Sequence, residues 1–393
     1  MTAFDPYLRH SVGEADKPLR EAGPVLWSDS AGAWLVTRFA DVSAVLRDPR
    51  FESFNLHQAF ARITGRGSLS FPHLQHYLEA SLIFVNDPDH RPLRRLLSRT
   101  LTSMPLSSLA PSMGKLARKL WRGCIARGEC DIVRDYAEIL PSMVSARLLG
   151  LDESERQAFF AATYGLMGAF NRGCSIARYR DFDARLGALR GTIDALFAER
   201  RRAPRADGLS RFLEEAASLG LSDDAAAANL TFLYLASVDQ TSAVIGLGIR
   251  RLKLQPEIAA AVRTKALDEA TLIEELIRIE SPAPQVIRVA TAAVKIGGVD
   301  IAAGDMLILL LSSANRDRQR YEEPHRVTPA RPRHVAFSEG AHACIGGAFA
   351  RVELAAALMP AIDRPPTWID ETPPEWWPLD ATRRLRSLRV RFE

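Results

Sequence analysis

The stretch that decides the fold reads FSEGAHACIGG and covers residues 337–347. It places Cys344 among three glycines, with His342 two residues before the cysteine. Glycines let backbone N–H groups approach the sulfur, and a helix expected from about Gly347 presents its positive end to it. Both features stabilise a thiolate, which is either a nucleophile or an axial ligand of heme iron. A nucleophile needs a base, for which His342 is too close along the loop, and an ordinary buried thiol is the third interpretation.

The composition is that of an ordinary globular protein. The chain has 393 residues, of which 47% are hydrophobic and 25% charged, enough for a sizeable core. The formal charge of +4 is too small to indicate nucleic-acid binding. No apolar run approaches the roughly 18 residues of a membrane helix, and MTAFDPYLRH at the start lacks the apolar core of a secretory signal. We therefore expect a cytoplasmic protein with no membrane anchor.

The four cysteines do not form a framework. None pairs with another at the CxxC spacing, so neither a zinc ribbon nor a set of disulfides is supported. Cys124, Cys130 and Cys174 are expected to be ordinary buried or half-buried thiols.

Hydrophobic periodicity predicts a mainly α chain with small β-sheets. Residues 51–86 are expected to be irregular, and neither a repeat nor a convincing linker divides the chain. We therefore expect a single domain, 1–393, with its β-rich part in about 1–50 and 286–311 and no doubly wound sheet. The expected helices are 89–103, 105–127, 133–149, 153–170, 176–202, 222–253, 269–280 and 347–362, and strands are expected at 286–290, 293–297, 306–311 and 386–392.

The cysteine loop and the residues after it, FSEGAHACIGGAFARVE, resemble the heme-binding signature of the cytochrome P-450 family. The matching residues are Phe337, Gly340, His342, Cys344, Gly346, Ala350 and Glu353, and Ser338 replaces the usual second-position glycine. The resemblance implies the cytochrome P-450 fold, a triangular prism of helices around a buried heme b. It also implies that Cys344 is the axial ligand of the heme iron, with Phe337 and Gly346 beside the cofactor.

A second match is EELIRIESP, in which Glu275 and Arg278 are three residues apart on one helix face. Without the resemblance, a solvated surface pair would explain them. The family's E-x-x-R pair is buried and locked to a downstream arginine, for which Arg331 is the candidate.

A third match concerns the heme propionates, which need cationic or hydrogen-bonding partners when buried. In DPDHRPLRRLL, His90 and Arg94 are four residues apart on one helix face, and Arg288 lies on an expected strand. Each alone is more often a surface charge or a core histidine. The resemblance implies that these three residues and His342 bind the propionates.

The helix NLTFLYLASVDQTSAVIGL carries polar residues inside an apolar run. The resemblance places it across the open face of the heme, with Ala236 and Ser237 nearest the oxygen site. The family then has an acid followed by a threonine. Asp239 matches the acid, but Gln240 takes the threonine position and Thr241 comes one residue, about 100°, later. We expect Asp239, Gln240, Thr241 and Ser237 to be the catalytic residues, with protons from Ser237, a water chain or the substrate.

The resemblance implies a monooxygenase that inserts one oxygen atom from O2 into a small molecule. Substrate contacts are implied for 55–85, 160–180, 230–241, 283–290 and about 377–381, where aromatic residues such as Phe60, Phe71, Phe159 and Phe232 indicate an apolar pocket. We expect a natural-product intermediate, with a fatty acid as the alternative. Because no flavin or nicotinamide fingerprint occurs, electrons are expected from a ferredoxin and an NAD(P)H–ferredoxin reductase, with Arg91, Arg95 and Arg99 as candidate docking residues.

Three other interpretations stay open. Oxidative coupling, desaturation or peroxide-driven oxidation could occur on the same heme, because Gln240 replaces the usual threonine. A heme-binding sensor or scaffold without turnover is a second, and a heme-free cysteine hydrolase is a third.

Overall fold

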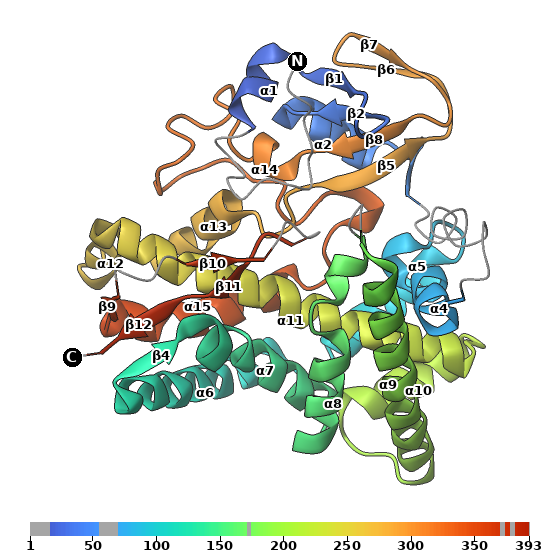
Figure 1. Ribbon diagram of the computed structural model, residues 1–393, viewed down its shortest axis with the longest axis vertical. Coiled ribbons are helices and arrows are strands. Elements are labelled where there is room, and N and C mark those ends of the chain that lie inside the picture. Colours follow the sequence, from blue (N-terminus) through green and yellow to red (C-terminus); the bar gives the residue numbers. More distant parts are fainter. Residues whose placement is uncertain (1–15, 55–69, 171–173, 370–373, 378–381, 393) are drawn as a thin grey trace. The chain divides into compact units, whose positions relative to one another are not determined.

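The computed structural model describes residues 16–54, 70–170, 174–369, 374–377 and 382–392 (Figure 1). Two compact units divide the chain. The first unit comprises Met1–Phe54, Ser112–Leu140 and Gln240–Glu393, and the second comprises Asn55–Pro111 and Pro141–Asp239. Helices predominate and the sheets are small, so the predicted fold class is confirmed. The expected single domain stays a prediction.

The first unit contains a five-stranded sheet in the order β1-β2-β8-β5-β3. The strands are β1 (Val25–Ser28), β2 (Ala33–Val36), β3 (Phe51–Ser53), β5 (Val286–Ala290) and β8 (Met306–Leu309). β2 and β8 run parallel, whereas the other neighbours are antiparallel. Arg288 stands opposite Leu307 of β8 on one side and Ser53 of β3 on the other, so its backbone is fixed between two strands of the sheet.

Three smaller sheets complete the β structure of the described residues. One has the order β4-β12-β9, and the other two are the pairs β10-β11 and β6-β7. Their strands are β4 (Glu129–Asp131), β6 (Val294–Ile296), β7 (Val299–Ile301), β9 (Thr367–Trp368), β10 (Glu375–Trp376), β11 (Leu385–Ser387) and β12 (Arg389–Arg391).

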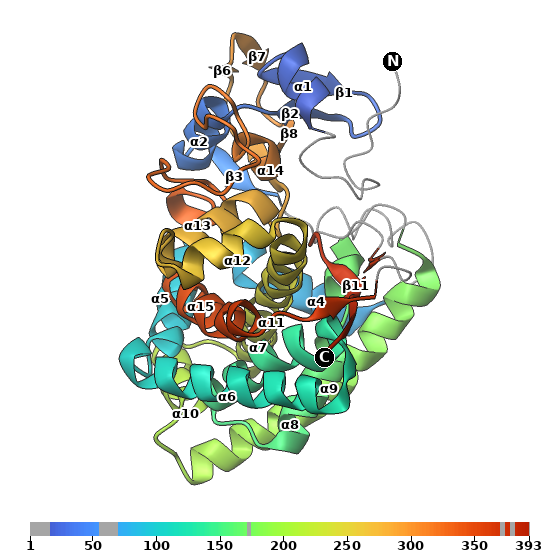
Figure 2. The ribbon, with the colours of Figure 1, turned by 90° about the vertical axis from the view of Figure 1, so that its left-hand side faces the viewer.

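Three helices of the first unit pack closely on one another. Close packing of the long helix α11 (Asp223–Leu254) against α13 (Glu269–Glu280) and α15 (Gly347–Asp363) depends on Gly248, because a Cβ there would lie 3.2 Å from Leu358 and 3.4 Å from Leu276 (Figure 2). The remaining helices are α1 (Lys17–Ala22), α2 (Phe39–Arg47), the π-helix η2 (Val133–Ala137), α12 (Pro256–Arg263), α14 (Leu311–Ala314) and η4 (Gly340–His342). Helix α6 (Leu106–Arg127), like α11, runs from one unit into the other.

The second unit is helical, and several of its helices begin at side-chain caps. Asp152 forms a capping box with Glu155 at the start of α8, and Asp207 caps α10. α8 and α4 pack on α9, and α10 packs on α5. Its elements are α4 (Pro72–Ala80), η1 (Leu82–Phe84), α5 (His90–Leu101), α7 (Ile139–Leu149), α8 (Glu153–Thr163), η3 (Leu166–Phe170), α9 (Ile176–Arg202) and α10 (Gly208–Ser218).

Three expectations need correction. The stretch 51–86 is not irregular throughout, because it contains β3, α4 and η1. The helix expected over 153–170 is two elements, because Gly165 adopts φ +71° between them. The helix expected over 133–149 begins with a π-helical turn before α7. Among the described residues, α11 alone is long and apolar enough to cross a membrane, and most of its apolar window is buried inside the protein.

Candidate functional site

The loop that carries Cys344 is closed by its own backbone. The Cys344 N–H donates to the carbonyl of Phe337 at 2.8 Å, and the Ala343 N–H donates to Gly340 at 3.1 Å. Gly346 follows as the N-cap of α15. Cys344 is exposed, although free cysteines are among the most buried residue types. The fold therefore presents this sulfur at the positive end of a helix instead of burying it.

Two neighbouring positions of the loop adopt left-handed backbone angles. Gly340 has φ +70°, and a Cβ there would lie 2.1 Å from the Leu46 carbonyl oxygen, so only glycine fits. Ser338, which stands where the family has glycine, has φ +58°. Its hydroxyl is buried without a hydrogen-bond partner among the described residues. The serine is thus a strained replacement, not the neutral one that its small size suggests.

The side chains of α2 hold the loop from one side. The Ser43 hydroxyl donates to the Glu339 carboxylate at 2.5 Å, and the Arg47 Nε lies 3.6 Å from the same carboxylate. Together with the contact between Gly340 and Leu46, they fix the start of the loop on α2.

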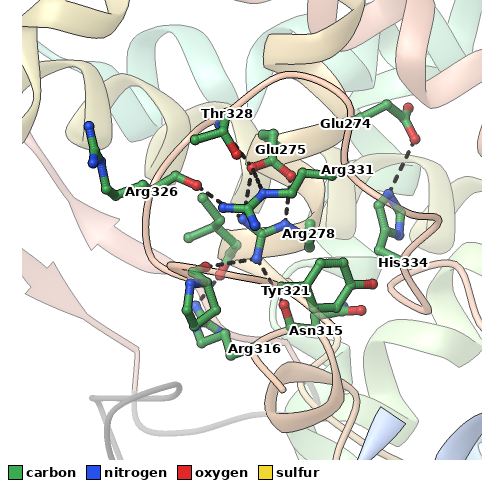
Figure 3. Close-up of polar contacts among 12 residues, drawn as sticks. Glu274, Glu275, Arg278, Asn315, Arg316, Tyr321, Arg326, Thr328, Arg331 and His334 are labelled. Atoms are coloured by element: carbon green, nitrogen blue, oxygen red, sulfur yellow. Dashed lines mark hydrogen bonds and ion pairs between the residues drawn. The ribbon is translucent and has the colours of Figure 1, made fainter. Parts of the chain in front are cut away.

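Glu275 and Arg278 form a buried ion pair on α13 (Figure 3). The Arg278 guanidinium donates to both Glu275 carboxylate oxygens, at 2.6 and 2.8 Å, and to the carbonyls of Asn315 and Pro324 at 2.9 and 2.7 Å. The structure brings Arg331 to the pair, with its Nε 3.6 Å from Glu275. The three predicted residues therefore lie together, and they hold the segment that precedes the cysteine loop.

A second ion-pair group was missed in the sequence. The Glu274 carboxylate accepts from Arg351 on α15 and lies 3.3 Å from the His334 Nε2. Burial disfavours the charged carboxylate, but the hydrogen bonds from His334 and Arg351 prevail and lower the pKa of Glu274 to about 2. The Arg351 guanidinium also stacks over the Phe337 ring at 4.7 Å, so α13, α15 and the loop are joined.

Arg288 is a buried cation in the middle of β5. It is only 5% exposed, and its Nη1 donates to the neighbouring Ile287 carbonyl at 2.9 Å. Among the described residues no carboxylate lies against it, and burial lowers its pKa to about 10. A buried guanidinium needs an anion, so this site fits the carboxylates of a porphyrin. His342, in η4 of the same unit, is half-buried.

In the second unit, His90 and Arg94 occupy the first two turns of α5. His90 is buried and Arg94 is half-buried. The two residues are one helical turn apart, so they lie on the same face of the helix, as predicted. Of the nearby arginines, Arg91 pairs with Asp87 at 2.9 Å and Arg99 with Glu215 at 3.5 Å, whereas Arg95 is exposed.

The middle of α11 is buried except at one small residue. Ala236 is exposed and Ser237 is half-buried, whereas Leu235, Val238 and Asp239 are buried. The Ser237 hydroxyl donates to the Leu233 carbonyl at 2.6 Å. Thr241 is buried one position beyond Gln240. Between positions 226 and 250 of α11, Ala236 is the one exposed residue.

The Gln240 side chain is anchored at one end. Its Nε2 donates to the Thr382 Oγ1 at 2.6 Å, while its Oε1 is buried with no donor among the described residues. This contact joins α11 to the segment that leads into β11, 142 positions along the chain. This contact could not be predicted from the sequence, because nothing local distinguishes Thr382.

The residues proposed to contact substrate fall into two groups. Phe71 and Phe159 are core residues, at 3% and 0% exposure. Phe84, Met167 and Phe232 are partly buried against the cluster around Phe71. Phe60 and positions 378–381 lie outside the described residues.

Glu353, the last residue of the signature, is a buried acid on α15. It is 1% exposed, and its Oε1 has no hydrogen-bond partner among the described residues. Burial raises the pKa of this carboxyl to about 8, so it is mostly neutral at pH 7.

Comparisons with known proteins agree with this picture. Residues 43–364 match the Cytochrome P450 family model. The biotin biosynthesis cytochrome P450 of Bacillus subtilis is 28% identical over 92% of this chain and 90% of its own length. Pentalenic acid synthase of Streptomyces avermitilis is 32% identical over 89% of this chain and 86% of its own. The crystal structure of P450BioI with a hexadec-9Z-enoic acid-ligated acyl carrier protein matches with TM-score 0.87 and 26% identity, covering 97% of this chain and 98% of that one.

Proposed function

This chain belongs to the cytochrome P450 family, whose cofactor is heme b, and we propose that it oxidises a mainly apolar natural-product intermediate with one oxygen atom from O2. The single observation that carries the proposal is the exposed Cys344 sulfur, held at the start of α15 in a loop that only glycine at position 340 permits. The names of relatives support the substrate class, since they include pentalenic acid synthase and a cyclomarin C epoxidase.

Heme b, when bound, supplies the iron at which O2 is activated, and a thiolate ligand favours cleavage of the O–O bond. The remaining tasks fall to the chain. We propose that the Cys344 sulfur would hold the heme iron. We assign Arg288, His342, His90 and Arg94 to the propionates, because Arg288 is a buried cation without an acidic partner among the described residues.

Two features beside the Cys344 sulfur favour its charged form. The helix dipole of α15 favours a negative charge at its N-terminus, and Arg351 on the same helix adds a cation whose pKa is raised chiefly by hydrogen bonds to Glu274 and slightly by Cys344. We propose that Phe337 and Gly346, which belong to the loop, lie beside the heme, and that the heme lies against α11 at Ala236.

Proton delivery is the step at which this chain departs from its family. Asp239 supplies a buried acid, but the Gln240 carboxamide cannot relay a proton as a hydroxyl can. Because its Nε2 is tied to Thr382, we propose that Gln240 positions a water or a polar substrate group while Asp239 provides the acid, with Ser237 and Thr241 as the nearby hydroxyls. If Gln240→Thr left product identity and the yield of product per NADH unchanged, this assignment would be wrong.

Oxidation driven by hydrogen peroxide, oxidative coupling or desaturation is the second candidate. The observation that favours it is Gln240 itself, since hydrogen peroxide brings oxygen that is already reduced and protonated and needs no proton relay at this position. Replacing the electron donors by hydrogen peroxide tests the peroxide-driven reaction alone: product formed equally well with peroxide supports that reaction, whereas coupling or desaturation is recognised from the product.

We further propose that electrons come from a ferredoxin reduced by an NAD(P)H–ferredoxin reductase, with the exposed Arg95 as one docking residue. Reduction should weaken with salt and with Arg95→Glu. The control is Arg178→Glu, a partly exposed arginine on α9. Equal loss in both variants would refute docking at Arg95.

The test of the whole proposal is spectroscopic. Purified protein should contain heme, its carbon monoxide complex should have the spectrum of a thiolate-ligated heme, and terpenoid, polyketide and peptide compounds should be screened for a shift of the Soret band from about 420 nm to shorter wavelength. Cys344→Ala should lose the thiolate spectrum, whereas the control Cys174→Ala should keep it. A colourless protein would favour a hydrolase, and heme without any compound-dependent shift would favour a sensor or scaffold.

A further inference from the structure

Two cysteines outside the heme site lie against each other in the first unit. Cys124 is in the last turn of α6, and Cys130 is the middle residue of β4. Both are buried, and their thiols are within hydrogen-bonding distance of one another. The sequence suggested only ordinary buried thiols, because their six-residue separation matches no common motif.

A tight turn between helix and strand creates this contact. Gly128 adopts φ +75°, and its N–H donates to the Ile125 carbonyl at 3.0 Å. The turn is held from the other side by Phe392, whose N–H donates to the Gly128 carbonyl at 2.7 Å, and Cys130 stands opposite Val390 of β12. The two sulfurs are therefore kept together by backbone structure on both sides of the turn.

The surroundings give the two thiols different roles. A hydrogen bond from the Cys130 thiol lowers the pKa of Cys124 against the opposing effect of burial, and Arg127, whose Nη2 is 3.5 Å from the Cys124 sulfur, lowers it further. The same hydrogen bond and burial raise the pKa of Cys130. The Asp135 carboxylate opposes the effect of Arg127 by raising the pKa of both thiols, and Arg127 lies 3.5 Å from that carboxylate. Cys124 is thus the thiol that ionises, and the thiolate is the reactive form.

We propose that Cys124 and Cys130 are a redox modification site that forms a reversible disulfide on exposure to hydrogen peroxide. The Cys124 thiolate attacks one peroxide oxygen, the O–O bond breaks, and after protonation a sulfenic acid and water result. The Cys130 sulfur then displaces the hydroxyl group and loses its proton, so that the S–S bond forms and a second water leaves. The two thiols lose two electrons, and the peroxide is reduced to two waters.

The pair is connected to the helix that follows the Cys344 loop. Trp121, one turn before Cys124, packs edge-on against Tyr136 with ring centroids 5.0 Å apart. The Tyr136 hydroxyl donates to the Ala357 carbonyl of α15 at 2.6 Å. A disulfide at the junction of α6 and β4 would therefore stiffen a segment that supports α15, and we expect it to raise the Tm by about 2–4 °C.

The experiment uses the full-length, heme-loaded enzyme. It is treated with hydrogen peroxide or, to spare the porphyrin, with diamide, then denatured, alkylated and digested with trypsin without reduction. Because trypsin cleaves after Arg122, Arg127 and Arg134, the two cysteines fall on separate peptides, GCIAR (123–127) and GECDIVR (128–134). The expected product is these two peptides linked, with the mass of their sum less two hydrogens, released by a reductant.

Two variants separate the pair from other thiols. Cys174→Ser should still give the linked peptides. Cys130→Ser, which keeps a hydroxyl donor beside Cys124, should not give them and, with dimedone present, should instead accumulate a dimedone adduct at Cys124. The wild-type digest decides by itself if Cys130→Ser does not fold. Recovery of 123–127 and 128–134 as alkylated free thiols after oxidation, or a crosslink involving Cys174 or Cys344, would overturn the proposal.

Discussion

Replacing Glu353 with Gln tests whether α15 carries a neutral acid. The carboxyl is buried, its Oε1 has no hydrogen-bond partner among the described residues, and burial raises its pKa from 4.5 to about 8. In the unfolded chain this carboxyl loses its proton near its ordinary pKa, whereas in the folded chain it keeps the proton until about pH 8. The stabilising contribution is therefore fully present below about pH 4.5 and is lost as the pH rises to about 8.

The magnitude follows from the difference in proton binding. At 1.36 kcal/mol per pKa unit, wild type should lose about 3–4 kcal/mol of unfolding free energy relative to Glu353→Gln between about pH 5 and pH 8. Burial of the glutamine amide has its own cost, but that cost does not vary with pH. The measurement is therefore how the difference in unfolding free energy between the two proteins changes with pH, and not the size of that difference at one pH. Contributions from all other groups cancel in the difference between the two proteins.

The assay is urea unfolding of wild type and variant at several pH values in this range. Glu257→Gln, at an exposed position on α12, is the matched control and should track wild type at every pH. A difference between wild type and Glu353→Gln that stays constant from about pH 5 to pH 8 would show that Glu353 is ionised when folded, and the reasoning would be refuted.

Three further substitutions test the loop and its support. Ser338→Gly should stabilise the protein by about 1 kcal/mol in urea unfolding, because glycine tolerates φ +58° and removes an unsatisfied hydroxyl; a loss would contradict the strain. Gly340→Ala should lower the free energy of unfolding by about 2–4 kcal/mol and reduce the heme content, because the alanine methyl group would lie 2.1 Å from the Leu46 carbonyl oxygen. Normal heme content in this variant would contradict the reasoning. Arg278→Lys should lower the free energy of unfolding by about 3–5 kcal/mol, because lysine cannot satisfy the Glu275 carboxylate and the backbone carbonyls together. Arg326→Lys, at an exposed ion pair, should lower it by less than about 1 kcal/mol, and equal losses would show that burial of the pair is irrelevant.

Features encoded by short-range patterns could be predicted from the sequence. The long helices α9, α11 and α15 end within about one residue of the expected positions, because apolar periodicity and capping residues are local signals. The Glu275–Arg278 pair follows from helical spacing alone. Where local signals conflict, prediction fails: the sequence pattern indicates an irregular segment at α4, since the start of this helix is marked only by Pro72 at the first helical position.

Features that depend on distant partners could not be predicted. Glu274 meets Arg351 across 77 positions, and Gln240 meets Thr382 across 142. No periodicity or motif links such residues, because the contact exists only once the helices have packed. The strain at Ser338 was equally hidden, since residue size does not reveal a left-handed backbone angle.

The contacts that fix the thiol are separate from those that fix the Gln240 side chain. The Cys344 loop is held by Ser43 and Leu46 of α2, and by Arg351 of α15, which pairs with Glu274 of α13. Gln240, by contrast, is held by Thr382 alone among the described hydrogen bonds. Because the two sets share no residue, the threonine position can be replaced without disturbing the loop that presents the sulfur. This separation explains how a chain can keep the cysteine signature of its family while its distal helix departs from the family pattern.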